Sequence, residues 1–205
     1  MINRNLYSKS CWDFYLNNYL NSYGELHKGE EITGVTTMNR VRGCSRARNP
    51  CSFCNIFTLD PQFSTAKIFW NEVITANKQV NSNVFYEVCD SFSSFPKHID
   101  TILEAKPKNL NFDPKFFVYV QVIDIVGNPN LVNQLKAMGV FKVNIGIESG
   151  DNRTLKHMKG RYDSVERNYK ALVILKNAGL KVYGSFVLGC EVETYETLNN
   201  TINWI

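Results

Sequence analysis

Short stretches rich in Val, Ile, Phe and Tyr alternate along this chain with longer stretches of helical character. We expect strands near residues 34–41, 84–89, 116–124, 142–148 and 181–188. We expect helices near residues 65–79, 96–105, 129–138, 163–178 and 195–205. Because such alternation is typical of parallel strands joined by helical crossovers, the sequence predicts an α/β fold with a mostly parallel sheet. Five successive right-handed βα units favour a curved, partial (βα) barrel of the TIM type.

The segment before the first strand has a different character. Aromatic and leucine side chains recur at helical spacing over residues 10–23, and a polar stretch follows up to residue 32. We therefore expect an N-terminal helical arm, residues 1–32, and a core domain, residues 33–205. No run of 18 apolar residues and no signal-peptide stretch occurs, which predicts a cytoplasmic protein without a membrane span.

Three of the six cysteines lie within eleven residues, directly after the first predicted strand. They are Cys44, Cys51 and Cys54, with the spacing C-x6-C-x2-C. Neighbouring thiolates repel one another unless a cation neutralises them, so this loop predicts a metal site. A structural zinc ion needs four ligands, and the fourth is missing locally. An iron–sulfur cube held by three cysteines would instead leave one iron open to a small molecule. A zinc-binding structural module stays the alternative.

The other cysteines stand alone in the sequence. Isolated cysteines in a reduced compartment are usually small core residues, so we expect Cys11, Cys89 and Cys190 to pack in the interior. Polar residues and glycines follow the predicted strands, and in parallel α/β folds the chemistry belongs to these carboxyl ends. On the fourth strand, Asn144, Gly146 and Glu148 share one face, which we expect to point into the barrel.

Four stretches of the chain together resemble the radical S-adenosylmethionine (SAM) superfamily, and most of all its cobalamin-dependent and methylthiotransferase-type branch. They are the cysteine loop with Phe53 before its last cysteine, and residues 85–92, 143–160 and 184–194. The loop is three residues longer than the C-x3-C-x2-C spacing of that family. The cobalamin signature Asp-x-His-x-x-Gly does not occur, so the sequence does not support a cobalamin site on this chain.

The resemblance implies that Cys44, Cys51 and Cys54 hold a 4Fe–4S cluster, and that the cluster cleaves SAM reductively to a 5′-deoxyadenosyl radical. It also implies that SAM contacts come from strand ends. Phe53 would pack near the adenine, Asp90 would accept a hydrogen bond from the SAM ammonium, and Glu148 would bind the ribose hydroxyls or the ammonium. The remaining expected contacts are Gln121, where relatives often carry an arginine, Ser149, and the backbone of Leu188 and Gly189.

Four arginines, Arg40, Arg42, Arg46 and Arg48, surround the cysteine loop. We expect this basic patch to attract an acidic electron donor such as flavodoxin or ferredoxin. A net charge of +4, without a basic stripe interleaved with aromatic residues, argues against nucleic acid as a partner, although an RNA-modifying enzyme of the same family is an alternative.

The family core normally has six βα units, and this chain shows five. We therefore expect a second copy of the chain, or a missing C-terminal region, to cover the open edge of the sheet. An incomplete, inactive copy of such an enzyme is a further alternative. The substrate is not readable from these residues.

Overall fold

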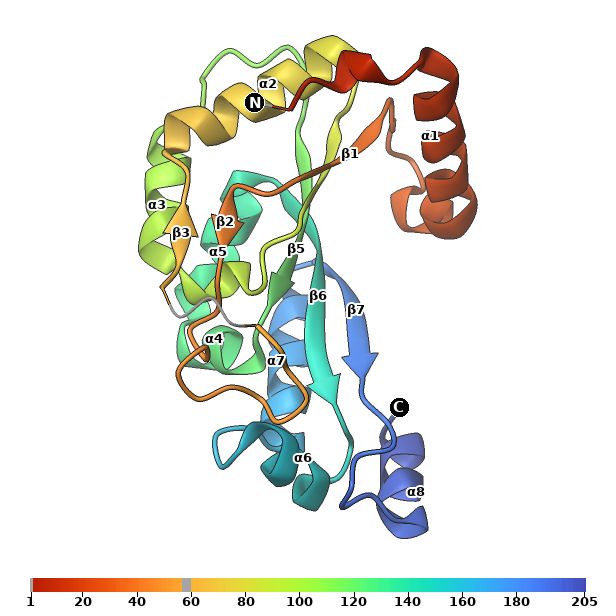
Figure 1. Cartoon of the computed structure of the whole chain (residues 1–205), viewed down its shortest axis with the longest axis vertical. Coiled ribbons are helices and arrows are strands. Elements are labelled where there is room, and N and C mark those ends of the chain that lie inside the picture. Colours follow the sequence, from red (N-terminus) through yellow and green to blue (C-terminus); the bar gives the residue numbers. More distant parts are fainter. Residues whose placement is uncertain (1, 57–59) are drawn as a thin grey trace.

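The computed structural model describes residues 2–56 and 60–205. Its centre is a five-stranded parallel sheet in the order β1-β4-β5-β6-β7 (Figure 1). The strands are β1 (Val35–Met38), β4 (Val84–Glu87), β5 (Lys115–Val120), β6 (Val140–Glu148) and β7 (Lys181–Phe186). The expected α/β fold with a mostly parallel sheet is confirmed.

Five helices pack on one face of this sheet and form the core with it (Figure 1). They are α2 (Ala66–Val80), α3 (Pro96–Glu104), α4 (Val122–Gly127), α5 (Pro129–Met138) and α7 (Val165–Asn177). Two more helices, α6 (Asn152–Lys159) and α8 (Tyr195–Trp204), lie beyond the carboxyl ends of the strands. None of the described helices is long and apolar enough to cross a membrane.

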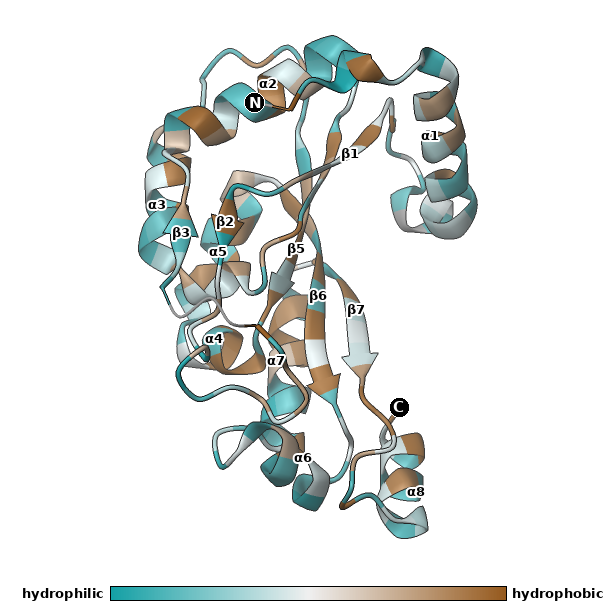
Figure 2. Ribbon diagram, viewed as in Figure 1, coloured by the Kyte–Doolittle hydropathy of each residue, from teal (hydrophilic) through white to brown (hydrophobic). Residues whose placement is uncertain are grey.

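Strand alternation decides which side chains enter the core. On β6, Val143, Ile145 and Ile147 are buried against the helices, whereas Asn144 and Gly146 face the opposite side, as expected. Figure 2 shows the hydrophobic residues of the strands and of the helices behind them gathered in the middle of the molecule. The polar face of β6 therefore stays available for a site.

Several expected elements have different bounds. The strand expected at 116–124 ends at Val120, and the chain turns at once into α4. Val122 and Ile125 are both buried, at a spacing that suits a helix, so tertiary packing overrides the β propensity of this Val/Ile run. The expected first strand divides into β1 and β2 (Val41–Arg42), and β2 pairs with β3 (Gln62–Phe63) in a second, antiparallel sheet. Helix α6 was not expected.

The N-terminal segment is tied to the core by a buried arginine. Arg4, in the 3-10 helix η1 (Arg4–Leu6), lies 2.5 Å from Glu72 Oε1 through Nη1, and it donates to Thr36 Oγ1 at 2.9 Å. Arg40 Nη2 contacts the other Glu72 oxygen at 2.8 Å. Glu72 is fully buried, so one carboxylate of α2 joins the N-terminus to the segment that leads into the cysteine loop.

Helix α1 (Lys9–Tyr23) lies on the other side of the sheet from the helical layer (Figure 1). The ring of Tyr23 is 4.1 Å from Lys142 Nζ, and His27, in η2 (Gly24–His27), packs on Phe141 at 4.7 Å. The arm thus packs on the start of β6, and its boundary at residue 32 stays a prediction. Cys89 is buried as expected, but Cys11 is exposed, because none of the α1 side chains is fully buried.

A buried carboxyl on β4 makes folding stability depend on pH. Glu87 Oε1 accepts hydrogen bonds from the backbone N–H groups of Arg40 (2.9 Å) and Val41 (3.3 Å), and burial raises the Glu87 pKa from 4.5 to about 8. Between these values the folded protein keeps a proton that the unfolded chain releases. The free energy of unfolding should therefore fall as pH rises from 4.5 to 8, by up to about 1.4 kcal/mol per pH unit.

The Glu87→Gln variant should remove this contribution, because the amide cannot ionise and its oxygen can still accept both backbone hydrogen bonds. Urea unfolding at pH 5.5, 6.5 and 7.5 measures the slope for each protein. Glu104→Gln, at the exposed end of α3, is the matched control and should leave the slope unchanged. Parallel pH profiles for the wild type and Glu87→Gln would contradict the expectation.

Candidate active site

The carboxyl ends of the strands and the loop after β2 enclose a cavity of about 170 Å³. Seven of the expected site residues line it: Cys44, Cys51, Phe53, Cys54, Asp90, Gln121 and Glu148. Side chains outside the expected set of SAM and cluster contacts also line it, among them Arg46, Tyr119, Asn144, Lys159 and Ser185. The fold therefore brings most of the expected site together in one place, at the end of the sheet where α/β enzymes carry their chemistry.

Backbone hydrogen bonds shape the cysteine loop. The N–H of Ala47 donates to Cys44 O at 3.0 Å and that of Cys54 to Cys51 O at 2.9 Å, which makes two tight turns. Gly43 enters the loop with φ 109°, a conformation that favours glycine, and its N–H donates to Asp90 Oδ2 at 2.9 Å. The backbone N–H of Ser52 donates to Met158 O at 2.8 Å and fixes the loop to α6.

The three thiols are free and half-buried. Burial raises the pKa of both the Cys44 and the Cys51 thiol, and the nearby Arg46 guanidinium opposes the shift. Within residues 2–56 and 60–205, no three His, Cys, Asp or Glu side chains stand close enough together to hold a single metal ion. Neither a histidine nor a fourth cysteine is among the described residues that line the cavity. This donor set fits a cluster held by three thiolates better than a closed tetrahedral zinc site.

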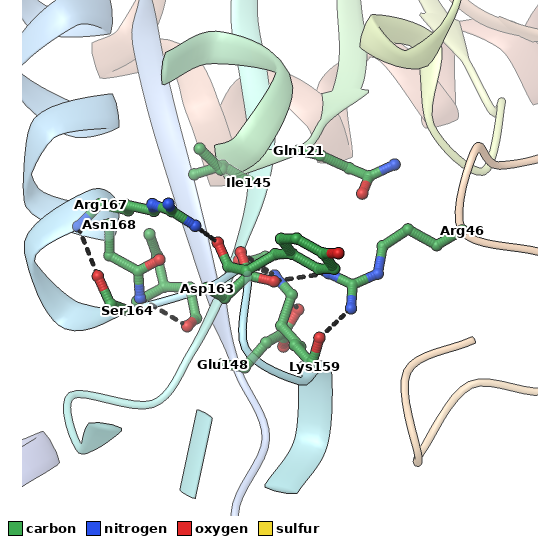
Figure 3. A network of polar contacts seen from close by, with 12 residues as sticks. Arg46, Gln121, Ile145, Glu148, Lys159, Asp163, Ser164, Arg167 and Asn168 are labelled. Carbon is green, nitrogen blue, oxygen red and sulfur yellow. Dashed lines mark hydrogen bonds and ion pairs between the residues drawn. The ribbon is translucent and has the colours of Figure 1, made fainter. Parts of the chain in front are cut away.

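An ion-pair network connects this loop to α6 (Figure 3). Arg46 Nη1 lies 2.5 Å from Asp163 Oδ2, and Arg46 Nη2 donates to the backbone carbonyl of Lys159. Lys159 Nζ donates to Gly146 O at 3.0 Å and lies 3.9 Å from Glu148 Oε1. The network holds a lysine ammonium and a glutamate carboxylate side by side at the wall of the cavity.

Glu148 has an unusual backbone conformation. Its φ of 63° lies in the left-handed region, which non-glycine residues seldom adopt, and it ends β6 at an irregular pairing with β7. The side chain folds back over Gly146, where an added Cβ would overlap Glu148 Oε1. Burial raises the Glu148 pKa, and the Lys159 ammonium opposes that shift. A larger residue at position 146 would therefore displace the Glu148 carboxylate from its present position.

Gln121 is held against the cysteine loop by a cluster of serines. Its Nε2 lies 3.3 Å from Cys44 Sγ, 2.9 Å from Ser91 Oγ and 2.8 Å from Ser94 Oγ. Ser94 Oγ also donates to Asp124 Oδ2 at 3.2 Å. The serines were not assigned a role from the sequence, although three of them occur within residues 91–94, directly after the aspartate at a strand end.

Three expected site residues do not line the cavity. Ser149 is buried, and its hydroxyl is 3.0 Å from Thr201 Oγ1, so it joins β6 to α8. Leu188 and Gly189 lie beyond the end of β7, and the Leu188 side chain is 62% exposed. Their contact with SAM stays a prediction. Lys159 also lines the cavity and was not among the expected site residues; the sequence signal was its place before a glycine within the stretch 143–160.

The expected basic patch is smaller than the sequence indicated. Arg46 is paired with Asp163, and Arg40 with the buried Glu72 at 2.8 Å, so carboxylates of the protein itself neutralise both guanidinium groups. Of the four arginines, Arg42 and Arg48 are exposed. An acidic partner would therefore meet fewer exposed arginines near this loop than the sequence suggested.

Three cysteine thiols line one cavity at the carboxyl ends of the strands of a partial barrel. This arrangement is typical of enzymes that bind a metal cluster at that end of the sheet. A model of the radical SAM superfamily matches residues 38–205 of this chain. The chain belongs to that superfamily.

Individual proteins show the same relationship. The anaerobic magnesium-protoporphyrin IX monomethyl ester cyclase of Rubrivivax gelatinosus is 27% identical over 171 residues, which cover 82% of this chain and 30% of the relative. The candidate methylthiotransferase MJ0865 of Methanocaldococcus jannaschii is 31% identical over 106 residues, 45% of this chain and 23% of the relative. The cobalamin-dependent SAM radical enzyme OxsB, solved with aqua-cobalamin and SAM bound, superposes with a TM-score of 0.68 at 19% identity, over 84% of this chain and 26% of its own.

The radical SAM methyltransferase TsrM of Kitasatospora setae, solved with cobalamin and a [4Fe–4S] cluster bound, superposes with a TM-score of 0.68 at 18% identity, over 83% of this chain and 32% of its own. These comparisons confirm the expected family, the partial TIM-type barrel, and a 4Fe–4S cluster and SAM as the cofactors of the family. The chain spans less than a third of the length of these relatives.

Proposed function

We propose that this chain is the catalytic core of a radical SAM enzyme, with Cys44, Cys51 and Cys54 as the cluster ligands. When bound, the cluster supplies the electron that breaks a sulfonium C–S bond of SAM, giving methionine and a 5′-deoxyadenosyl radical that takes hydrogen from a substrate. The observation that carries the proposal is that the three thiols line one cavity together with Glu148 and Lys159.

Charged side chains of the cavity suit the amino-acid part of SAM. The Lys159 ammonium, which is 6% exposed and held by Gly146 O, would pair with the SAM carboxylate. Asp90 uses Oδ2 to accept the Gly43 N–H, so Oδ1 would be left to accept from the SAM ammonium. Together, the Lys159 ammonium and the Asp90 carboxylate would orient the sulfonium toward the cysteine loop.

The nucleoside part of SAM needs acceptors and an apolar rim. Asn144 Oδ1 is buried and has no hydrogen-bond partner among the described residues, so it would accept from a ribose hydroxyl or the adenine amine. Glu148, folded over Gly146, would accept from the other ribose hydroxyl. Phe53, 44% exposed at the rim, would cover the adenine and exclude water from the reacting bond.

Anaerobic reconstitution tests this function. The full chain, incubated with iron and sulfide, should become brown and bind about four irons. With dithionite and SAM it should then release methionine and 5′-deoxyadenosine in equal amounts, measured by liquid chromatography. A colourless protein that binds one zinc ion, or a brown protein that leaves SAM intact, would contradict the proposal.

A further inference from the structure

The face of the sheet that is turned toward α1 carries a set of aromatic rings next to the candidate site (Figure 1). The ring centres of Tyr86 and Phe117 are 4.5 Å apart in a stacked arrangement, and those of Tyr86 and Tyr119 are 5.7 Å apart. Tyr119 also lines the cavity of the cysteine loop. On the edge strand β7, Tyr183 is 50% exposed and is paired in register with Asn144, which lines the same cavity. We call Tyr86, Phe117, Tyr119 and Tyr183 the inner aromatic surface.

A lysine is buried within this surface. Lys142 is 2% exposed, and its Nζ lies 4.5 Å from the centre of the Phe117 ring and 5.7 Å from that of Tyr183. Tyr23, at the end of α1, covers the ammonium from the other side at 4.1 Å. A lysine is seldom fully buried without a charged partner, because its ammonium loses its hydration. The ring faces compensate part of this loss by cation–π attraction, and an anionic group of a ligand would compensate the rest.

Carboxylates of the protein itself do not neutralise this ammonium. Burial lowers the pKa of Lys142, and no carboxylate among the described residues opposes that shift. Glu30, toward the amino ends of the strands, is paired with two other lysines at 3.4 and 3.8 Å. Toward the cavity, Glu148 lies 3.9 Å from Lys159. The inner aromatic surface therefore offers a positive charge that an anionic ligand can use.

Lys142 lies close enough to the cavity for one small molecule to reach both. In the sheet, Lys142 is paired with Phe117, and the next row toward the cysteine loop contains Tyr119, Asn144 and Tyr183. Neighbouring residues on one face of a strand are about 6–7 Å apart. A planar ring that lies flat on Tyr119 and Tyr183 would thus have one edge at the cavity and the other near the ammonium.

Helix α1 leaves room for such a ligand. None of its side chains is fully buried, and Tyr23 is 37% exposed. The Tyr23 ring can therefore move away from Lys142 at the cost of one cation–π contact, and the ligand takes its place over the ammonium.

We propose that the inner aromatic surface and Lys142 bind the substrate of this enzyme, and that the substrate is a planar aromatic carboxylate. The inference rests on the proposed function, since it names the class of molecule that gives up the hydrogen atom. The rings select a planar ligand by stacking, and the Lys142 ammonium selects a carboxylate over a neutral group. Together they place the carbon atoms at the far edge of the ligand in the cavity, beside the cysteine loop.

Isothermal titration calorimetry of the full chain tests the proposal, with 2-naphthylacetate as the probe and the uncharged 2-naphthaleneethanol as its analogue. Lys142→Met should weaken the binding of 2-naphthylacetate about 10- to 100-fold, because a charge-assisted hydrogen bond is lost, and should leave the binding of the alcohol unchanged. Tyr183→Ala should weaken both probes about three- to tenfold, because stacking is lost. Lys170→Met, at an exposed position of α7 in the helical layer, is the matched control and should bind both probes as the wild type does.

Several results would overturn the proposed substrate class. They are equal affinity of the wild type for the two probes, an equal effect of Lys142→Met on both, or the same loss of affinity in Lys170→Met. If circular dichroism shows that Lys142→Met is unfolded, Tyr183→Ala decides, and unchanged affinity in that variant overturns the inference.

The titration needs no cluster, so its outcome is separable from the proposed function. A chain that cleaves SAM but does not bind 2-naphthylacetate would overturn the substrate class alone. A chain that binds the probe as expected but leaves SAM intact after reconstitution would contradict the proposed function, and with it the assignment of the ligand as a substrate.

Discussion

The Cys54→Ala variant should not retain a 4Fe–4S cluster and should form no detectable 5′-deoxyadenosine. Removing one thiol leaves two cysteines in the cavity, and no described histidine or fourth cysteine lines it to replace the missing ligand. Cys89, the nearest alternative in sequence, is fully buried, and its thiol points to Gly43 O at 3.9 Å. Iron content after anaerobic reconstitution should fall from about four per chain to below one, and the visible thiolate-to-iron absorption should disappear.

Cys11→Ala is the matched control, because it removes an exposed thiol on α1. It should keep the iron, the colour and the wild-type yield of 5′-deoxyadenosine. Circular dichroism of both variants would show whether the fold is retained. A brown Cys54→Ala protein that still cleaves SAM, or a colourless Cys11→Ala protein, would contradict the assignment of the ligands.

Replacing Glu72 by alanine should lower the free energy of unfolding by about 3–5 kcal/mol, because it leaves the buried Arg4 guanidinium and the partly buried Arg40 guanidinium without their counter-charge. Glu72 is fully buried and binds Arg4 at 2.5 Å and Arg40 at 2.8 Å. The loss should loosen the N-terminus and the approach to the cysteine loop together. Urea unfolding followed by tryptophan fluorescence measures it, since Trp70 lies in the same helix.

Glu196→Ala provides the comparison, because it also breaks a Glu–Arg pair, but at the surface. Glu196 lies 3.2 Å from Arg153, with both side chains more than half exposed. Solvent screens such a pair, and its loss should cost no more than about 1 kcal/mol. Equal losses for the two variants would show that the buried network contributes no more than an exposed pair.

The features of this protein that depend on residues close together in the sequence were predicted correctly. Alternation placed Val143 and Ile145 in the core and Asn144 and Gly146 on the inner face, because a strand has a fixed period of two. The cysteine spacing identified the loop for a similar reason. Residues 122–124 were expected to continue a strand, because Val and Ile favour strands, but the packing of Val122 and Ile125 at helical spacing makes them part of α4.

Contacts between distant residues could not be read in this way. Glu72 is joined to Arg4 across 68 residues, and Arg46 to Asp163 across 117. The basic loop looked like a docking patch, since nothing near Arg46 in the sequence shows that its carboxylate partner comes from the turn before α7. The sequence marked Lys159 only by its place before a glycine, because its position beside Glu148 exists only after β6 and α6 have packed.

The attachment of the cysteine loop to α6 sets an order of events during synthesis. Cys51 and Cys54 leave the ribosome well before Met158 and Asp163, to which Ser52 and Arg46 must attach. At 5–20 residues per second this interval is roughly 5–25 s. During this interval the nascent chain carries the three thiols but lacks α6, which contacts the cysteine loop in the folded protein. Under the proposed function, iron and sulfide would therefore meet the finished site only after α6 has been translated and has packed on the cysteine loop.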